Sequence, residues 1–272
     1  MAERGTMVRH PAVAGHFYPA GAAALERELQ RLVRPDAKRR RALGLMAPHA
    51  GYVYSGGCAG QGYARVELAA TVVLLGVNHR GTGAELAVDG HDAWQTPLGR
   101  VEVDAGLRGR LLASSRLFAE DSEAGRLEHS LEVQVPFIQH VAPSSRILPV
   151  TVAAHRLDDL LAAGEELAPL VAGNGGAMMV ASSDMSHYIP AERARELDLL
   201  AVERMLQLDP EGLYRVVRDR RISMCGVAPA VIMLQAARRA GASGAELVCY
   251  TNSGEASGDR EEVVGYASLV VF

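Results

Sequence analysis

Short apolar runs alternate with helical patterns along the whole chain, and this alternation most constrains the fold. Thr71-Val72-Val73-Leu74-Leu75-Gly76 is the clearest run, with the length and β-branched content of a buried strand. Residues 22–33 instead place Leu25, Leu29 and Leu32 at helical spacing between charged side chains. Alternating strands and helices are typical of an α/β fold whose central mixed or largely parallel sheet is flanked by helices.

The same patterns predict the other elements. We expect further strands at residues 42–47, 85–88, 99–103, 146–152, 177–181, 246–250 and 263–271. We expect further helices at residues 56–66, 130–140, 157–171, 191–206, 210–219 and 227–239, with turns at 94–97 and 173–176. No repeat or linker divides this series, so the prediction is a flexible N-terminus over residues 1–8 and a single domain over residues 9–272.

Composition narrows the classes of function. A chain of 272 residues that is 49% hydrophobic can bury a sizeable core. Its net charge of −4 gives no reason to expect nucleic acid or an anionic membrane as a partner. The first residues lack the apolar block of a signal peptide, and no apolar stretch approaches the roughly 20 residues of a membrane span. Three widely spaced cysteines suggest no disulfide framework, so we expect a cytoplasmic protein.

Two absences exclude further chemistry. Lys38 is the only lysine, and it lies in a basic run, residues 38–41, that we expect to be solvated. This is a poor setting for a Schiff base or for a phosphate-binding lysine. The chain also has neither G-x-G-x-x-G nor G-x-S-x-G, so dinucleotide binding and a nucleophile elbow lack their usual signals.

Three potential metal ligands follow strand ends or small-residue turns. His49 lies in Pro48-His49-Ala50-Gly51, His79 follows the strand that ends at Gly76, and Cys225 precedes Gly226 at the expected start of a helix. Ligands bind at the carboxyl ends of the strands in open α/β folds, where distant residues converge. A lone histidine is more often structural, but imidazoles and a thiolate together can form a redox-metal site. We expect the helix field to favour the thiolate of Cys225.

Other acid–imidazole pairs suit proton transfer. Asp184 and His187 are three residues apart just beyond a strand, so Asp184 either orients a ligand histidine or caps a turn. Glu128-His129-Ser130 forms a second such pair at the expected start of a helix. Ser183, Asp184 and His187 lie close together in sequence, whereas the members of a hydrolase triad are brought together by the fold. Their spacing is therefore no basis for predicting a hydrolase triad.

Several blocks, in order, resemble the MEMO family, which includes the AmmeMemoRadiSam system protein B-like proteins and is related to the class III extradiol dioxygenases. The resemblance spans nearly the whole chain. It is carried by RHPAVAGHFYP (9–19), PHAGYVYSG (48–56), GVNH (76–79), EHSLEVQVPF (128–137), SSDMSHY (182–188), CG (225–226) and YAS (266–268).

The resemblance implies an α/β fold with a metal site near the strand ends. His49 and His79 match the two imidazole ligands of the related dioxygenases, and Cys225 stands where those enzymes carry a glutamate ligand. His187 matches their acid–base histidine, His129 a second histidine of the substrate pocket, and Asp184 an acidic residue beside the site in MEMO proteins. His187, His129 and Asp184 are therefore the expected catalytic residues.

Replacing a carboxylate ligand by a thiolate changes the expected chemistry. Two histidines and a carboxylate suit Fe(II) and O₂, whereas a thiolate softens the site, widens the choice toward copper and adds an oxidisable ligand. One hypothesis is therefore a non-haem iron oxidoreductase or dioxygenase that acts on a small phenolic substrate. The alternative is a non-catalytic metal- or peptide-binding protein that has lost extradiol activity. The sequence leaves the metal, the substrate and the oligomeric state open.

Overall fold

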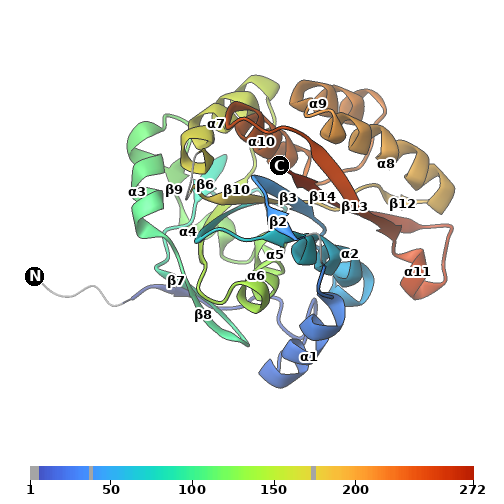
Figure 1. Ribbon diagram of the computed structural model, residues 1–272, viewed down its shortest axis with the longest axis horizontal. Helices are drawn as coiled ribbons and strands as arrows, with labels where there is room; N and C mark the ends of the chain where they lie inside the picture. The colour runs from blue at the N-terminus through green and yellow to red at the C-terminus, as the bar shows by residue number, and fades with distance from the viewer. Residues whose placement is uncertain (1–5, 37–38, 173–175) are drawn as a thin grey trace, which may run out of the picture.

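A nine-stranded mixed sheet crosses the computed structural model, which describes residues 6–36, 39–172 and 176–272 (Figure 1). Its strand order is β12-β14-β3-β11-β5-β10-β6-β9, and β13 also pairs with β14. The parallel centre consists of β3 (Gly44–Ala47), β11 (Met178–Ser182), β5 (Thr71–Val77) and β10 (Arg146–Val152). Antiparallel pairs involve β14 (Val263–Val271), β13 (Ala245–Asn252), β12 (His187–Ile189) and β6 (Leu86–Val88), and β9 (Ala119–Glu120) lies parallel to β6 at the edge.

Two small sheets lie beside the large one. The first contains β1 (Val8–Arg9), β7 (Ala93–Thr96) and β8 (Gly99–Glu102), and the second pairs β2 (Arg40–Arg41) with β4 (Val66–Glu67). Val8 therefore takes part in β1, whereas residues 1–5 of the predicted flexible N-terminus lie outside the described residues. Lys38 and residues 173–175 of the predicted turn lie outside them too.

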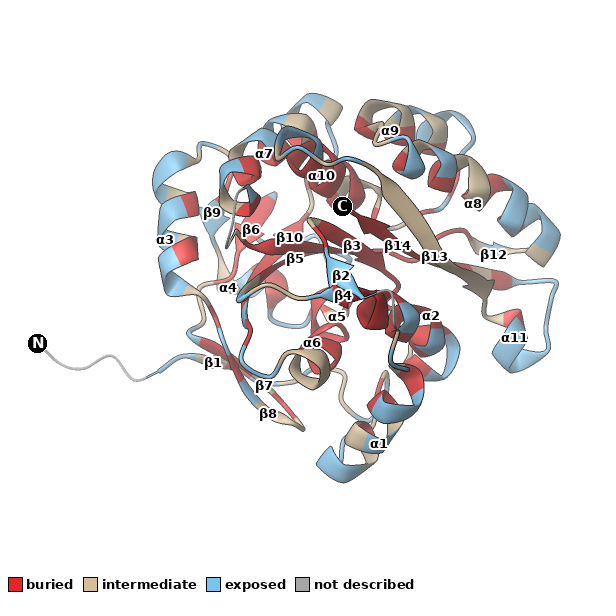
Figure 2. Ribbon diagram, viewed as in Figure 1, coloured by how far each residue is buried: buried red, intermediate tan, exposed pale blue. Residues whose placement is uncertain are grey.

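Helices cover both faces of the sheet (Figure 1). One face is covered by α7 (Leu157–Val171), α8 (Ala191–Leu206), α9 (Pro210–Asp219) and α10 (Val227–Arg239). The other is covered by α1 (Ala22–Leu32), α2 (Tyr52–Arg65), α5 (His129–Glu132) and α6 (Val135–Val141). The remaining helices are α3 (Ala105–Ser114), α4 (Ser122–Gly125) and α11 (Gly254–Ser257). Figure 2 shows the core concentrated in the sheet, as expected for strands that are covered on both sides.

The predicted α/β class is confirmed, and several predicted elements agree with the structure to the residue: 146–152, 157–171, 191–206, 210–219, 227–239 and 263–271. None of the helices in the described part of the chain combines the length and apolar character needed to cross a bilayer.

Three local predictions were wrong. The helix expected from residue 56 begins at Tyr52, whose backbone N–H donates to the Phe17 carbonyl and whose ring is buried. The helix expected over 130–140 is split into α5 and α6, because Pro136 stands at the start of α6 and proline cannot continue a preceding helix. Trp94, expected in a turn, lies in β7, where its buried indole donates to Asp89.

Candidate functional site

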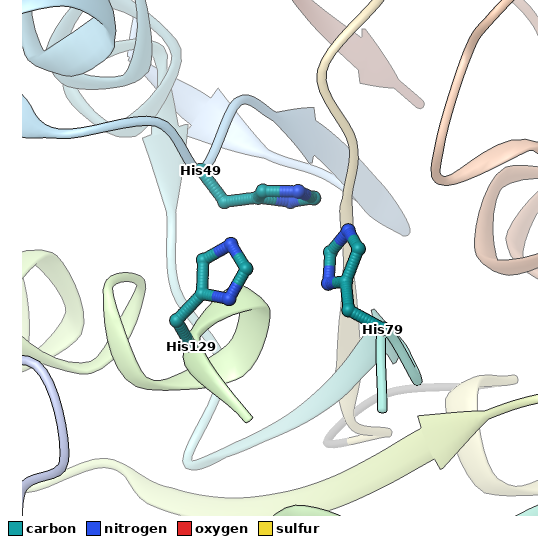
Figure 3. Close-up of side chains that lie close together, drawn as sticks. All are labelled: His49, His79 and His129. Atoms are coloured by element: carbon teal, nitrogen blue, oxygen red, sulfur yellow. The ribbon is translucent and has the colours of Figure 1, made fainter. Parts of the chain in front are cut away.

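Three imidazoles converge at the carboxyl ends of the central strands. His49 follows β3, His79 follows β5, and His129 is the first residue of α5, which packs beside β5. One potential ligand atom from each ring lies within 4.8 Å of the others (Figure 3). Because β3 and β5 both lie parallel to β11, their ends meet at one edge of the sheet. The sequence predicted His49 and His79 as ligands, and the structure brings His129 beside them.

Ser182 determines which nitrogen of His49 is free. The Ser182 hydroxyl donates to the Ser130 carbonyl at 2.6 Å and accepts from Gln134 Nε2 at 2.8 Å. Its proton is therefore committed, and at 3.0 Å from His49 Nδ1 the hydroxyl oxygen accepts from that nitrogen. The lone pair of His49 then lies on Nε2. Burial, and secondly the charge of His79, lower the pKa of His49 to about 3, so the ring is neutral.

Glu128 determines which ring nitrogen of His79 is free. Its carboxylate accepts the His79 backbone N–H at 2.8 Å and His79 Nδ1 at 3.0 Å, which leaves Nε2 free for a metal. The carboxylate also accepts the Ser130 backbone N–H at 2.9 Å. Burial alone raises the pKa of Glu128, but hydrogen bonds from His79 and Ser130 outweigh it and hold that pKa at about 2. A charged carboxylate is therefore built in beside the imidazoles.

His129 is the third imidazole of the cluster and packs between His79 and Phe17. Its Nδ1 lies 3.3 Å from Glu128 Oε1, its ring stacks on His79 with centroids 4.7 Å apart, and Phe17 packs at the same distance. Burial lowers the pKa of His129 to about 4, so this ring is neutral too. Neutral imidazoles are the form that binds metals.

The cluster fits a first-row metal ion. Nitrogens on one ion lie about 3 to 4 Å apart, because each metal–nitrogen bond is about 2.1 Å. The spread of up to 4.8 Å is slightly wider, so a small inward movement of the rings would satisfy one ion. The donor set of three imidazoles, two of them oriented by Ser182 and Glu128, is the observation that supports this fit.

Cys225 lies beside His49. Its Sγ is 3.3 Å from His49 Nε2 and also accepts the Asp184 backbone N–H at 3.3 Å. Gly226 permits this approach, since a Cβ there would collide with Ser183 and with the Ser182 carbonyl. The thiolate expectation was wrong for the metal-free site: burial, and secondly the negative charge of Asp184, raise the pKa of Cys225, and the helix field does not overcome them. The thiol donates to His49 Nε2, so a metal would compete for that lone pair.

Asp184 holds the main chain of the site. Its Oδ1 accepts the His49 backbone N–H at 2.8 Å, while Oδ2 lies 4.0 Å from His49 Nε2. Asp184 thus fixes the position of His49, whereas Ser182 sets its tautomer. Burial raises the pKa of Asp184 to about 6, so this carboxyl can change its charge near neutral pH.

His187 lies farther out, at the start of β12. Its Nδ1 is 2.8 Å from the Ser223 carbonyl, and its backbone N–H donates to the Ser223 hydroxyl. Because a carbonyl can only accept, Nδ1 carries the hydrogen and Nε2 is the basic atom. A positive charge on His187 would lower the pKa of both His49 and Asp184, so it lies within electrostatic reach of the cluster.

The sequence did not identify Ser182 and Gln134 as supports, and it recorded Glu128 only as part of an acid–imidazole pair. Ser182 is the last residue of β11, between the two histidine-bearing strands, so strand order alone would have drawn attention to it. Gln134 joins the site through the break between α5 and α6, which no sequence pattern indicates.

Known proteins resemble this chain over almost its full length. The family model described as "Memo-like protein" matches residues 9–270. A "MEMO1 family protein" of Methanosarcina barkeri is 43% identical over 97% of this chain and 100% of its own length. A namesake from Aquifex aeolicus is 41% identical over 97% of this chain and 98% of its own. An uncharacterized protein of Escherichia coli K12 shares the fold, with a TM-score of 0.51, 15% identity, and coverage of 84% of this chain and 99% of that one.

Proposed function

This chain belongs to the Memo-like protein family, and from that premise we propose that it binds a redox-active metal at His49, His79 and His129. Fe(II) is our first expectation and copper the second, because imidazole suits both metals and a thiol is at hand. The observation that carries the proposal is the convergence within 4.8 Å of three imidazoles, of which His49 is buried, His129 half-buried and His79 exposed. The supports of His49 and His79 leave Nε2 of both rings available.

Cys225 provides a second way to complete the site. Its sulfur is 3.3 Å from His49 Nε2, a separation at which both atoms can bind one ion, given metal–sulfur and metal–nitrogen bonds of about 2.3 and 2.1 Å. Two ligand sets therefore share His49 and His79, one closed by His129 and the other by Cys225. Binding through sulfur requires the Cys225 thiol to lose its proton, and burial raises the pKa of that thiol. The Cys225 set should therefore form more readily as pH rises.

A bound Fe(II) or copper would supply O₂ and electron-transfer chemistry, and the protein would manage protons around a reducing, phenolic substrate. His187 Nε2 is placed to take a proton, because Nδ1 is held by Ser223. Asp184, with a pKa of about 6, can hold or release one near neutral pH. His129 lies between Phe17 and His79, where it can orient a ring-shaped substrate if Cys225 takes its place on the metal.

The second candidate function is non-catalytic binding of a metal or a peptide. It is favoured by exposed apolar side chains next to the site in sequence: Val53 and Tyr54 follow His49 at the start of α2, and Tyr188 follows His187. Val53 is 70% exposed and Tyr188 is 71% exposed, so these side chains offer contact area outside the metal cluster.

The test is anaerobic purification followed by loading with Fe(II) or Cu(I) and metal analysis of the wild type, four site variants and one control variant. We expect near-stoichiometric metal in the wild type and loss in His49→Ala and His79→Ala. His129→Ala and Cys225→Ser decide which ligand set operates, and a thiolate-to-metal charge-transfer band lost in Cys225→Ser would place sulfur on the metal. His140→Ala is the matched control, because His140 pairs with Glu26 outside the cluster. Full occupancy in His49→Ala would overturn the proposal.

Turnover separates the two candidate functions. Oxygen uptake by the Fe(II)-loaded protein with a panel of catechols and other phenols supports the enzyme, provided that His187→Gln slows it while leaving metal content unchanged. No uptake despite full loading supports the binding protein. In that case, a peptide display selection should yield ligands whose binding weakens in Tyr188→Ser.

A further inference from the structure

The two cysteines outside the metal site face each other across a helix–sheet contact. Cys58 lies in α2 and Cys249 in β13, and α2 packs on β13 and β14 (Figure 1). Ser268 of β14 is the cross-strand partner of Cys249. Its hydroxyl donates to the Cys58 carbonyl at 2.7 Å and lies 3.8 Å from Cys58 Sγ. Both thiols are thereby located over the same serine.

The direction of the side chains in β13 supports this placement. Tyr250 points toward α8, where its hydroxyl donates to Asp198. Because side chains alternate along a strand, Cys249 points to the other face, toward α2. Gly62 permits the close approach, since a Cβ there would lie 3.0 Å from Ser268 Cβ and 2.9 Å from Leu45 Cδ1. The helix is therefore brought close to the sheet beside the two cysteines.

The two thiols differ in access. Both line a surface cavity of about 280 Å³, in which Cys249 is half-buried and Cys58 is only 2% exposed. Gln61 Nε2 lies 3.6 Å from Cys249 Sγ, where it donates to the sulfur, and it also donates to the Gly57 carbonyl. A reagent in the cavity therefore reaches Cys249 first, and Cys58 lies behind it.

The pKa values of the two thiols differ in a way that also favours reaction at the more accessible Cys249. A hydrogen bond from the Cys58 thiol, helped by Gln61 and opposed by burial, lowers the pKa of Cys249. The same hydrogen bond, together with burial, raises the pKa of Cys58. A thiolate is the reactive form of cysteine, so the more accessible sulfur is also the more nucleophilic one.

We propose that Cys58 and Cys249 are a redox-modification site, at which hydroperoxides convert the two thiols into a reversible intramolecular disulfide. The Cys249 thiolate attacks one peroxide oxygen, the O–O bond breaks, and the other oxygen leaves as water or an alcohol after taking up a proton. Cys249 is then a sulfenic acid. The Cys58 sulfur attacks the Cys249 sulfur, gives up its proton, and displaces the hydroxyl group as water. Two thiols lose two electrons in total, and the peroxide gains them.

This site is distinct from the metal centre, and the inference does not rest on the proposed function. Cys225 precedes α10 and contacts His49 and Asp184, whereas Cys58 and Cys249 contact Ser268 and Gln61. The disulfide would link α2 to β13, so it should make local opening of this contact rarer.

Peptide mapping tests the proposal, because cleavage after arginine puts each cysteine on its own peptide. Cys58 falls on residues 42–65, Cys225 on 222–238 and Cys249 on 240–260. The full-length protein is treated with hydrogen peroxide in the presence of a chelator and digested without reduction. We expect a mass loss of two hydrogens, a cross-linked pair of peptides 42–65 and 240–260, and recovery of both free peptides after dithiothreitol.

Three variants make the result decisive. Cys225→Ser should still form the cross-link, which shows that the metal-site thiol is not required. Cys58→Ala should stop at a sulfenic acid on Cys249 that dimedone traps, and Cys249→Ala should give neither a cross-link nor a dimedone adduct on Cys58. The proposal is overturned if the oxidised wild type keeps both thiols free, if Cys249 stays a sulfenic acid while Cys58 remains reduced, or if the cross-link joins Cys225 or two molecules.

Discussion

Glu128 and Glu132 stand one turn apart in the same short segment and have different partners. Both side chains are 1% exposed. Glu132 pairs with the Arg9 guanidinium at 2.8 Å and also accepts the Tyr18 hydroxyl and two backbone N–H groups, those of Ala12 and Val13. Glu128 accepts His79 twice and the Ser130 backbone. One carboxylate closes the N-terminal segment onto the core, and the other supports the imidazole cluster.

The partner decides what a buried carboxylate can do. A guanidinium keeps its charge throughout the working pH range and presents its N–H donors in a fixed planar geometry. The Arg9–Glu132 ion pair, called the clasp below, therefore persists throughout that range. An imidazole can lose its proton or bind a metal, so the pairing of Glu128 depends on conditions. The two regions are still joined, since Arg9 Nη2 also donates to the Glu128 carbonyl and Nε to the Gly125 carbonyl. The clasp therefore holds the main chain from which Glu128 and His129 extend.

The largest effect is expected from Arg9→Ala. This change leaves the Glu132 charge buried without its cation and removes the guanidinium that lies 4.1 Å from the centre of the Trp94 ring. Breaking a buried ion pair from one side costs about 3–5 kcal/mol of unfolding free energy. Urea denaturation measures the loss, and Arg31→Ala is the control, because the exposed Arg31–Glu28 pair should contribute less than about 1 kcal/mol. A loss below 1 kcal/mol for Arg9→Ala would show that the clasp is dispensable.

A smaller and different effect is expected from Glu128→Gln. The amide keeps the shape of the side chain but loses the charge that fixes the His79 tautomer. Removal of such a supporting group weakens metal binding by about 10- to 100-fold. Competition titration of Fe(II) or Cu(I) against a chromophoric chelator measures the change.

The matched pair of variants sharpens the comparison. With both effects expressed as free energies, Glu132→Gln should destabilise the fold more than it weakens metal binding. Glu128→Gln should weaken metal binding more than it destabilises the fold. Glu123→Gln, at an exposed position of α4, should change neither. If Glu128→Gln and Glu132→Gln weakened metal binding equally, the two carboxylates would have to be treated as one unit.

The sequence predicted the parts of this molecule that depend on local pattern. The strands around Leu74 and Pro149 and helix α10 are long apolar or periodic segments, so their positions were recoverable. His49 and His79 were recognisable because both follow such strands.

What the sequence did not predict depends on burial and tertiary contact. The family resemblance placed His129 in the substrate pocket, but local pattern did not place it against the other two rings. It reaches them because α5 packs beside β5, and no periodicity indicates a four-residue helix. The protonated state of Cys225 follows from burial and from Asp184, 41 residues away in the chain. The pairing of Arg9 with Glu132 spans 123 residues. Local sequence carries no information on such distant neighbours.

The smallest predicted effect is a pH dependence on the imidazole side of the comparison. Burial, with the charge of His79 second, lowers the pKa of His49 from 6.5 to about 3, so the unfolded chain takes up this proton at higher pH than the folded one. The stability is therefore full above about pH 6.5 and is lost as pH falls toward 3. Between about pH 7 and 5.5 the loss from this residue is about 1 kcal/mol.

His49→Asn tests this dependence in the metal-free protein. Asparagine keeps an N–H donor for Ser182 but cannot titrate, so urea denaturation should show a shallower fall in stability between about pH 7 and 5.5, by about 1 kcal/mol. His129, whose pKa burial lowers to about 4, acts in the same direction, so part of the acid sensitivity should remain. An unchanged slope in His49→Asn would mean that His49 takes up its proton equally easily in the folded and unfolded chains. The neutral-imidazole account of the metal cluster would then lose its basis.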